Sequence, residues 1–133
     1  MLEMLLFAAK IALPDEENDN RGFWLGCVGL RSDGTLVFSK NGSVFSTITE
    51  NYQLLPGSHA ECRVLRKMDW GGTLYVARVA RKDRTIAMAR PCPICQVKIK
   101  AKGIKKVYYS INPTQWGVWN PKTDTDRIYS SAG

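Results

Sequence analysis

Side chains suited to a metal ion occur at two places in the chain: His59 at the first, and Cys92 with Cys95 at the second. Zinc binds imidazole nitrogen and thiolate sulfur readily, and a Cys-x-x-Cys spacing lets two thiolates reach one ion. Three protein ligands leave a fourth position open for water, as in catalytic zinc sites. We therefore predict that His59, Cys92 and Cys95 bind a catalytic Zn²⁺.

A carboxylate accompanies the first ligand, because Glu61 lies two residues after His59. Zinc lowers the pKa of a bound water to about 7. A neighbouring carboxylate can accept the proton of that water and return it to a leaving group. The spacing therefore predicts Glu61 as the catalytic proton shuttle.

Two other interpretations of these cysteines remain open. Because Cys62 lies three residues after His59, it would complete a closed, four-ligand structural zinc site. Alternatively, Cys62 is a small core residue, a common role of free cysteine. A redox-active Cys-x-x-Cys pair would leave His59 and Glu61 without a role. We favour the catalytic site, and whether Cys62 joins the metal stays open.

The elements that position these residues follow from the hydrophobic pattern. Helices are predicted over residues 2–13, 59–68 and 91–102, and strands over residues 23–31, 35–39, 73–80, 85–89, 105–111 and 116–119. The metal ligands then lie at the starts of two helices, where the helix dipole favours thiolates. Pro91 suits the start of the second of these helices. Too few residues separate the last two strands for a crossover helix, so these strands should be antiparallel.

Composition limits the class of protein. The chain has 133 residues, of which 44% are hydrophobic and 23% charged, and this supports one compact domain. We predict that the domain spans residues 1–120, with a polar and loose tail over residues 121–133. The longest apolar run is too short to span a membrane, and nothing indicates secretion, so we expect a cytoplasmic protein. The net charge of +7 favours anionic partners.

Two motifs carry a resemblance to a known family. His59-Ala60-Glu61 followed by Pro91-Cys92-Pro93-Ile94-Cys95 resembles the signature of the cytidine deaminase superfamily, the zinc-dependent deaminases of nucleosides, nucleotides and nucleic acids. Residues 88–110 are similar to short deaminase-like proteins of bacteria and phages. The resemblance implies an α/β fold of three layers, with a mixed five-stranded sheet, an antiparallel last strand and helices that carry the zinc motif.

The same resemblance implies a reaction and a set of substrate contacts. Zinc-bound hydroxide would attack C4 of cytosine, or C6 of adenine, and expel ammonia. Relatives assemble as oligomers, so a homo-oligomer is a further expectation. The expected substrate-binding residues are Asn41, Ser58, Ala60, Arg90 and Trp116.

Three functions remain as hypotheses. The antiparallel last strand resembles that of the free-cytidine deaminases, which favours a hydrolytic deaminase of a cytosine nucleoside or nucleotide. The second hypothesis is a deaminase of single-stranded DNA or RNA that grips phosphates with the basic residues between Arg78 and Arg90. The third is a binding module with structural zinc and no enzymatic activity.

Overall fold

The structure is a computed structural model that describes residues 2–14, 23–41 and 60–131. These residues form three helices and seven strands. In chain order the elements are α1 (Glu3–Ala12), β1 (Trp24–Leu30), β2 (Leu36–Lys40), α3 (Ala60–Leu65), β3 (Thr73–Val79), β4 (Ile86–Ala87), α4 (Pro93–Ala101), β5 (Lys106–Asn112), β6 (Gln115–Asn120) and β7 (Thr125–Ser130).

The described strands form one mixed sheet in the order β2-β1-β3-β5-β6-β7, and β4 pairs with β3. β3 and β5 run parallel, with Leu74 opposite Val107, and α4 lies on the connection between them. The other pairings within the described residues are antiparallel. The α/β class expected from the sequence is therefore confirmed, with seven strands in the part of the chain that the structure describes where the resemblance implied a five-stranded sheet.

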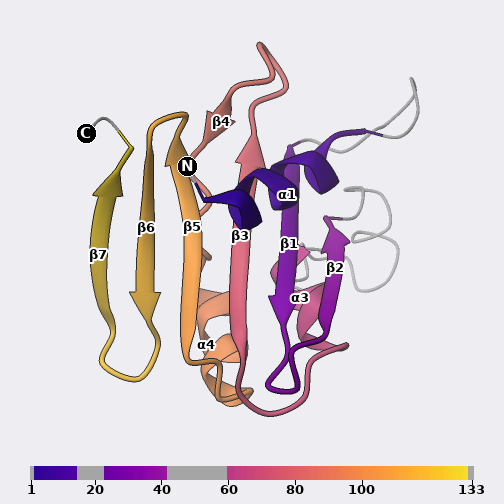
Figure 1. The fold of residues 1–133 in the computed structure, drawn as a ribbon, viewed down its shortest axis with the longest axis vertical. Helices are drawn as coiled ribbons and strands as arrows, with labels where there is room; N and C mark the ends of the chain where they lie inside the picture. Colours follow the sequence, from indigo (N-terminus) through magenta and orange to yellow (C-terminus); the bar gives the residue numbers. More distant parts are fainter. Residues whose placement is uncertain (1, 15–22, 42–59, 132–133) are drawn as a thin grey trace.

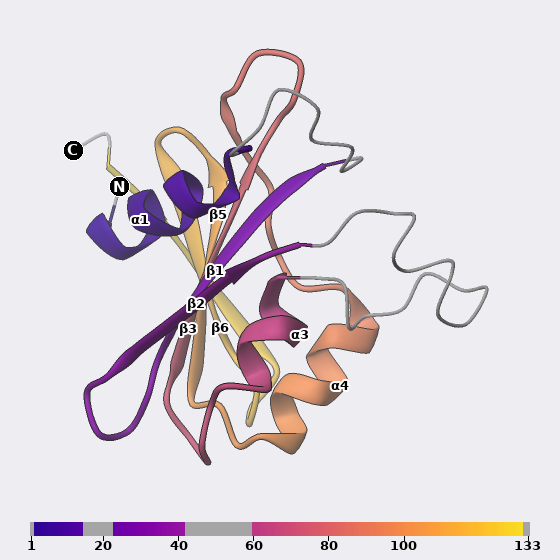
Figure 2. The same cartoon turned by 90° about the vertical axis from the view of Figure 1, so that its right-hand side faces the viewer.

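The helices lie on both faces of the sheet and make three layers. Figure 1 shows α1 in front of β1 and β3, with α3 and α4 behind the sheet, and Figure 2 shows the same layers edge-on. One buried cluster lies under α3 and α4 and includes Val64, Ile99 and Trp119. A second cluster lies under α1 and includes Ala8 and Ala77. β6 and β7 extend beyond α1 (Figure 1).

The first helix contacts the sheet very closely because three of the four buried residues on its inner face are alanines. Its buried positions are Leu5, Ala8, Ala9 and Ala12, which follow a helical spacing. A Cβ atom at Gly26 of β1 would lie 2.0 Å from the carbonyl oxygen of Ala8. The helix predicted over residues 2–13 is therefore present, and Leu6 lies on its exposed side.

The first hairpin forms at Ser32-Asp33-Gly34, between the strands predicted over residues 23–31 and 35–39, and Asp-Gly is a typical hairpin turn. Gly34 has a φ of 90°, and Asp33 Oδ1 accepts hydrogen bonds from the Thr35 backbone N–H at 2.9 Å and from its hydroxyl at 2.6 Å. These bonds lower the pKa of Asp33. β1 and β2 then pair in antiparallel register, with Val28 opposite Phe38.

The C-terminal part of the fold confirms one expectation and corrects another. β5 and β6 are antiparallel, with Tyr108 opposite Val118, as predicted from their short connection. Residues 121–133, expected to be a loose tail, instead include β7, which pairs with β6 along its whole length. The turn between these strands is closed by Asn120, whose side-chain oxygen accepts from the Lys122 N–H at 3.0 Å. None of the described helices is both long and apolar enough to cross a membrane.

Candidate active site

The Cys-x-x-Cys pair lies at the first turn of α4. Cys92 is the N-cap residue, and its sulfur accepts from the backbone N–H of Cys95 at 3.5 Å. The helix begins with Pro93 at its first turn, where the missing N–H costs no hydrogen bond. The helix was expected to start at Pro91 and instead starts at Pro93. The carbonyl of Pro91, outside the helix, accepts a hydrogen bond from the side chain of Gln96 at 2.7 Å. Both sulfurs therefore lie near the positive end of the helix dipole.

Glu61 reaches this pair from the first turn of α3. Its side chain is 1% exposed, and its Oε1 lies 3.6 Å from the Sγ of Cys95, which is fully buried. Burial raises the pKa of Glu61 to about 7 because removing a carboxylate from water disfavours its charged form. The structure thus brings together Glu61, Cys92 and Cys95, three of the four residues that the sequence assigned to the metal and the proton.

A cavity of about 200 Å³ opens beside Glu61 and Cys92. Typical sites for drug-sized ligands measure roughly 300–1,000 Å³. The part of the cavity that the structure describes is smaller and therefore suits a ligand with a single ring. Apart from Glu61 and Cys92, its lining combines two cations with apolar side chains: Arg78, Arg90, Phe23, Leu25, Met88 and Ala89.

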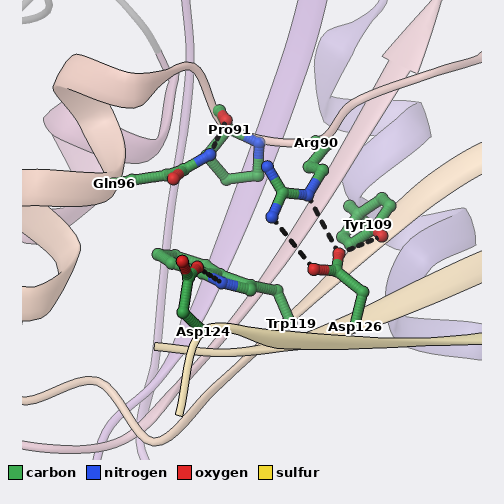
Figure 3. Close-up of polar contacts among 7 residues, drawn as sticks. All are labelled: Arg90, Pro91, Gln96, Tyr109, Trp119, Asp124 and Asp126. Atoms are coloured by element: carbon green, nitrogen blue, oxygen red, sulfur yellow. Dashed lines mark hydrogen bonds and ion pairs between the residues drawn. The ribbon is translucent and has the colours of Figure 1, made fainter. Parts of the chain in front are cut away.

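Arg90 at the rim of this cavity is held by β7. Its Nε and one Nη each donate to a carboxylate oxygen of Asp126 at 2.9 Å, and its guanidinium lies 5.7 Å from the ring centroid of Trp119 (Figure 3). Asp126 also accepts from the hydroxyl of Tyr109. The bond to Asp126 raises the pKa of Arg90, and the bond from Arg90 lowers the pKa of Asp126. Burial, followed by the bond to Asp126, raises the pKa of Tyr109 to about 12.

Asn41 lies close to the cavity, but its side chain is bonded to the backbone. Its Nδ2 donates to the carbonyl of Phe23 at 2.7 Å, and its Oδ1 accepts from the N–H of Leu25 at 2.9 Å. Phe23 and Leu25 both line the cavity, so Asn41 fixes the strand that forms one wall. Contact between Asn41 and a substrate stays a prediction.

Trp116, expected to line the pocket, is not brought to it. Side chains alternate between the faces of a strand, and Trp119 lies in the cluster under α3 and α4, so Trp116 lies on the opposite face. There it stacks on Tyr129, with ring centroids 5.9 Å apart. Within β6, Trp119 is instead the aromatic residue associated with the site, since it supports Arg90.

Part of the predicted site lies outside the described residues, namely Ser58, His59 and the side chain of Cys62. Ala60 is the fully buried first residue of α3. Among the residues that the structure describes, no cluster of three or more His, Cys, Asp or Glu side chains could hold a metal. The potential ligands that the structure describes are the two thiols of Cys92 and Cys95, beside the buried carboxyl group of Glu61. These are side-chain types that zinc binds.

The sequence analysis missed the residues that hold Arg90. Asp126 lies in the stretch predicted as a tail, and Tyr109 was assigned only to a strand. This stretch has no alternation of polar and apolar residues, and its one signal for a strand is the adjacent pair Ile128 and Tyr129, two residue types that favour strands. Compared with known proteins, the chain matches no protein-family model and no curated protein.

Proposed function

We propose that the chain is a zinc-dependent hydrolytic deaminase that converts cytosine to uracil in a free nucleoside or nucleotide. The observation that supports this proposal best is the contact of 3.6 Å between Glu61 Oε1 and Cys95 Sγ beside the small cavity. These residues come from two helices that are far apart in the sequence, so their meeting agrees with the resemblance to the cytidine deaminase superfamily. The mixed sheet with an antiparallel β5–β6 pair is consistent with that family.

Each residue has a role in this proposal. Cys92, Cys95 and His59 would hold zinc, which supplies the acidity that a water needs to attack at neutral pH. Glu61 accepts the proton of the water and delivers it to the departing amine. A bond from the water oxygen to C4 of the base forms, the bond from C4 to the amine breaks, and ammonia leaves. Burial of Glu61 keeps bulk water from competing for this proton.

The cavity walls orient the base. Phe23 and Leu25 provide an apolar wall, which suits the face of a pyrimidine ring. Arg90, already fixed by Asp126, lies at the rim and is placed to contact the sugar or a phosphate. Because a pre-positioned guanidinium loses little freedom on binding, this pairing favours an anionic substituent.

The decisive experiment is a substrate panel assayed by mass shift, run with the wild type and Glu61→Ala side by side. Cytidine, deoxycytidine, their phosphates and a cytosine-containing oligonucleotide form the panel, and the bound metal is quantified in both proteins. We expect the wild type to convert a small cytosine compound and Glu61→Ala to retain zinc without turnover. Zinc-loaded wild type that converts none of the panel would refute the proposal.

A second candidate is a deaminase of single-stranded DNA or RNA. It is favoured by the two arginines of the cavity, Arg78 and Arg90, both of which are exposed. Arg78 lies 5.8 Å from the ring centroid of Phe23, so a cation and an aromatic ring are available to a phosphate and a base. Conversion of the oligonucleotide alone in the panel would select this candidate.

If the chain is instead a non-enzymatic module with structural zinc, two variants should behave differently from those of a deaminase. With structural zinc, Cys62→Ser should lose the metal, and Glu61→Ala should change nothing measurable. With catalytic zinc, Cys62→Ser should keep the metal. Zinc content of the two purified variants therefore separates a structural from a catalytic site even before a substrate is known.

A further inference from the structure

A second and larger cavity lies at the other end of α4. It measures about 660 Å³, whereas the cavity at Cys92 measures about 200 Å³. Since α4 has nine residues, the two cavities are separated by about 14 Å along the helix axis. Figures 1 and 2 show α4 running towards the end of the sheet at which β5 begins. The polar residues that line this cavity are Lys100, Lys105, Lys106, Lys122 and Asn120.

Trp70 gives this cavity an exposed aromatic surface. Its side chain is 72% exposed, and a Cβ atom at Gly103 would lie 2.4–2.8 Å from carbons of the indole. The indole therefore rests directly on the backbone of Gly103. The loops on either side are joined by backbone hydrogen bonds, from Gly71 to the carbonyl of Lys102 at 3.0 Å and from Lys105 to the carbonyl of Gly72 at 2.9 Å. A large apolar ring is thus supported from beneath and presented to solvent.

The charged side chains that line this cavity have one sign. None of the described residues that line the cavity is Asp or Glu. The sequence from Arg84 to Thr123 contains eight Lys or Arg residues and no Asp or Glu. Lysines grouped without acidic partners repel one another, and an anionic ligand relieves this repulsion.

An adjoining cavity continues this surface around the end of the sheet onto the face opposite α4. It measures about 330 Å³, shares Lys106 and Asn120 with the first, and is also lined by Arg127 and Tyr129. Tyr129 stacks on Trp116 at an interplanar angle of 17°. The surface therefore has an aromatic ring in each cavity and five cations: Lys100, Lys105, Lys106, Lys122 and Arg127.

We propose that this surface, which we call the Trp70 surface, binds single-stranded nucleic acid. Lysines contact the phosphates, and an unpaired base stacks on the exposed face of Trp70, as in proteins that bind single strands without sequence preference. A mononucleotide would use only one ring and one or two cations, whereas two adjoining cavities suit a polymer. The proposal does not depend on the deaminase function, because the Trp70 surface and the Glu61 cavity share no lining residue among those described.

The test measures binding of a fluorescent oligothymidylate by anisotropy, since an oligomer without cytosine does not engage a cytosine-specific site. We expect Trp70→Ala to weaken binding roughly 5- to 150-fold. Phe38→Ala is the matched control, because Phe38 is an exposed aromatic residue (52%) on the β2 edge of the sheet; it should bind like the wild type. Equal binding by Trp70→Ala and the wild type would overturn the proposal.

A second pair of variants tests the cations independently of the indole. If three to five phosphates are contacted, the slope of log affinity against log salt should lie between about −2 and −3.5. Lys105→Gln combined with Lys122→Gln should reduce its magnitude by about 1.4, whereas Lys10→Gln combined with Lys40→Gln, on α1 and at the end of β2, should leave it unchanged. An unchanged slope in the first pair would overturn the proposal. Thymidine monophosphate or duplex DNA bound as tightly as the single strand would also overturn it.

Discussion

The two ends of α4 differ in burial and charge. At its N-terminal end, Glu61 and Cys95 are buried and in contact, and the adjacent cavity is small. At its C-terminal end, Trp70 and the surrounding lysines are exposed around a cavity more than three times larger. Moving a proton at a fixed atom requires a group held away from bulk water, whereas holding a charged polymer requires open, repeated contacts. On the two proposals, one helix would organise both kinds of site, the buried one at its start and the open one at its end.

The largest expected effect that separates the two ends comes from Glu61→Gln. The amide keeps the size of the side chain but cannot accept the proton, so kcat for the small cytosine substrate should fall by about 10²- to 10⁴-fold. Binding of oligothymidylate at the Trp70 surface should not change. Steady-state kinetics and anisotropy on the same preparation check both expectations.

Glu3→Gln is the matched control for Glu61→Gln, because Glu3 is an exposed glutamate on α1. It makes the same chemical change far from either cavity, and both readouts should stay at wild-type values. Turnover by Glu61→Gln within threefold of the wild type would remove Glu61 from the mechanism and make the N-terminal end a structural zinc site.

Gly103→Ala should have the reverse effect of Glu61→Gln, because it changes the Trp70 surface and leaves the Glu61 cavity intact. Its Cβ would lie 2.4 Å from the indole of Trp70, so the ring must move off its support. We expect oligothymidylate binding to weaken by about 5-fold or more, with kcat for the small substrate unchanged. Gly103 has a φ of 67°, so alanine also strains the backbone and costs about 1 kcal/mol of unfolding free energy.

Gly71→Ala separates the clash from the strain. Gly71 also has a positive φ, of 84°, but a Cβ there would meet no atom within 4 Å. It should therefore lose similar stability without moving the indole. If both variants weaken oligothymidylate binding equally, backbone strain and not the position of the indole is responsible, and the role assigned to Trp70 fails.

Much of the fold could be predicted from the sequence because local patterns determine it. Asp33-Gly34 predicts the first hairpin, and the short link between residues 111 and 116 predicts the antiparallel β5–β6 pair. The meeting of Glu61 with Cys95 followed from motifs alone. β7 was missed because all six of its residues are exposed, so it leaves no core-facing stripe, and its backbone pairing with β6 has no sequence signature.

The Trp70 surface could not be predicted either, for a different physical reason. Its lysines come from α4, the α4–β5 loop, β5 and the β6–β7 turn, and its indole from the α3–β3 loop. In the sequence, lysines along one helix are typical of a solvated face. Only tertiary structure brings Lys122 and Trp70 to the same cavity, and only the missing side chain of Gly103 lets the indole rest there.

The smallest expected effect comes from Asp126→Asn on β7, which links the C-terminal hairpin to the N-terminal end of α4. Asp126 pairs with Arg90 at side-chain exposures of 27% and 36%, and pairs this exposed contribute about 0.2–1 kcal/mol. Because Arg90 holds the pKa of Asp126 below its ordinary value, the folded state binds this proton less readily than the unfolded state. The stabilisation is thus complete above the unfolded pKa of about 4 and disappears as pH falls through the folded pKa.

Urea unfolding at pH 7 and pH 3 checks this expectation. Asp126→Asn should lower the free energy of unfolding by up to about 1 kcal/mol at pH 7 and by less at pH 3, with a higher KM for an anionic substrate because Arg90 is no longer held. Asp124→Asn is the control, since an amide oxygen can still accept from Trp119 Nε1, which now donates to Asp124 at 2.9 Å. An Asp126→Asn protein as stable at pH 7 as the wild type, with an unchanged KM, would show that Arg90 needs no partner from β7. The last hairpin would then serve only the Trp70 surface, and the two ends of α4 would be independent in structure as well as in chemistry.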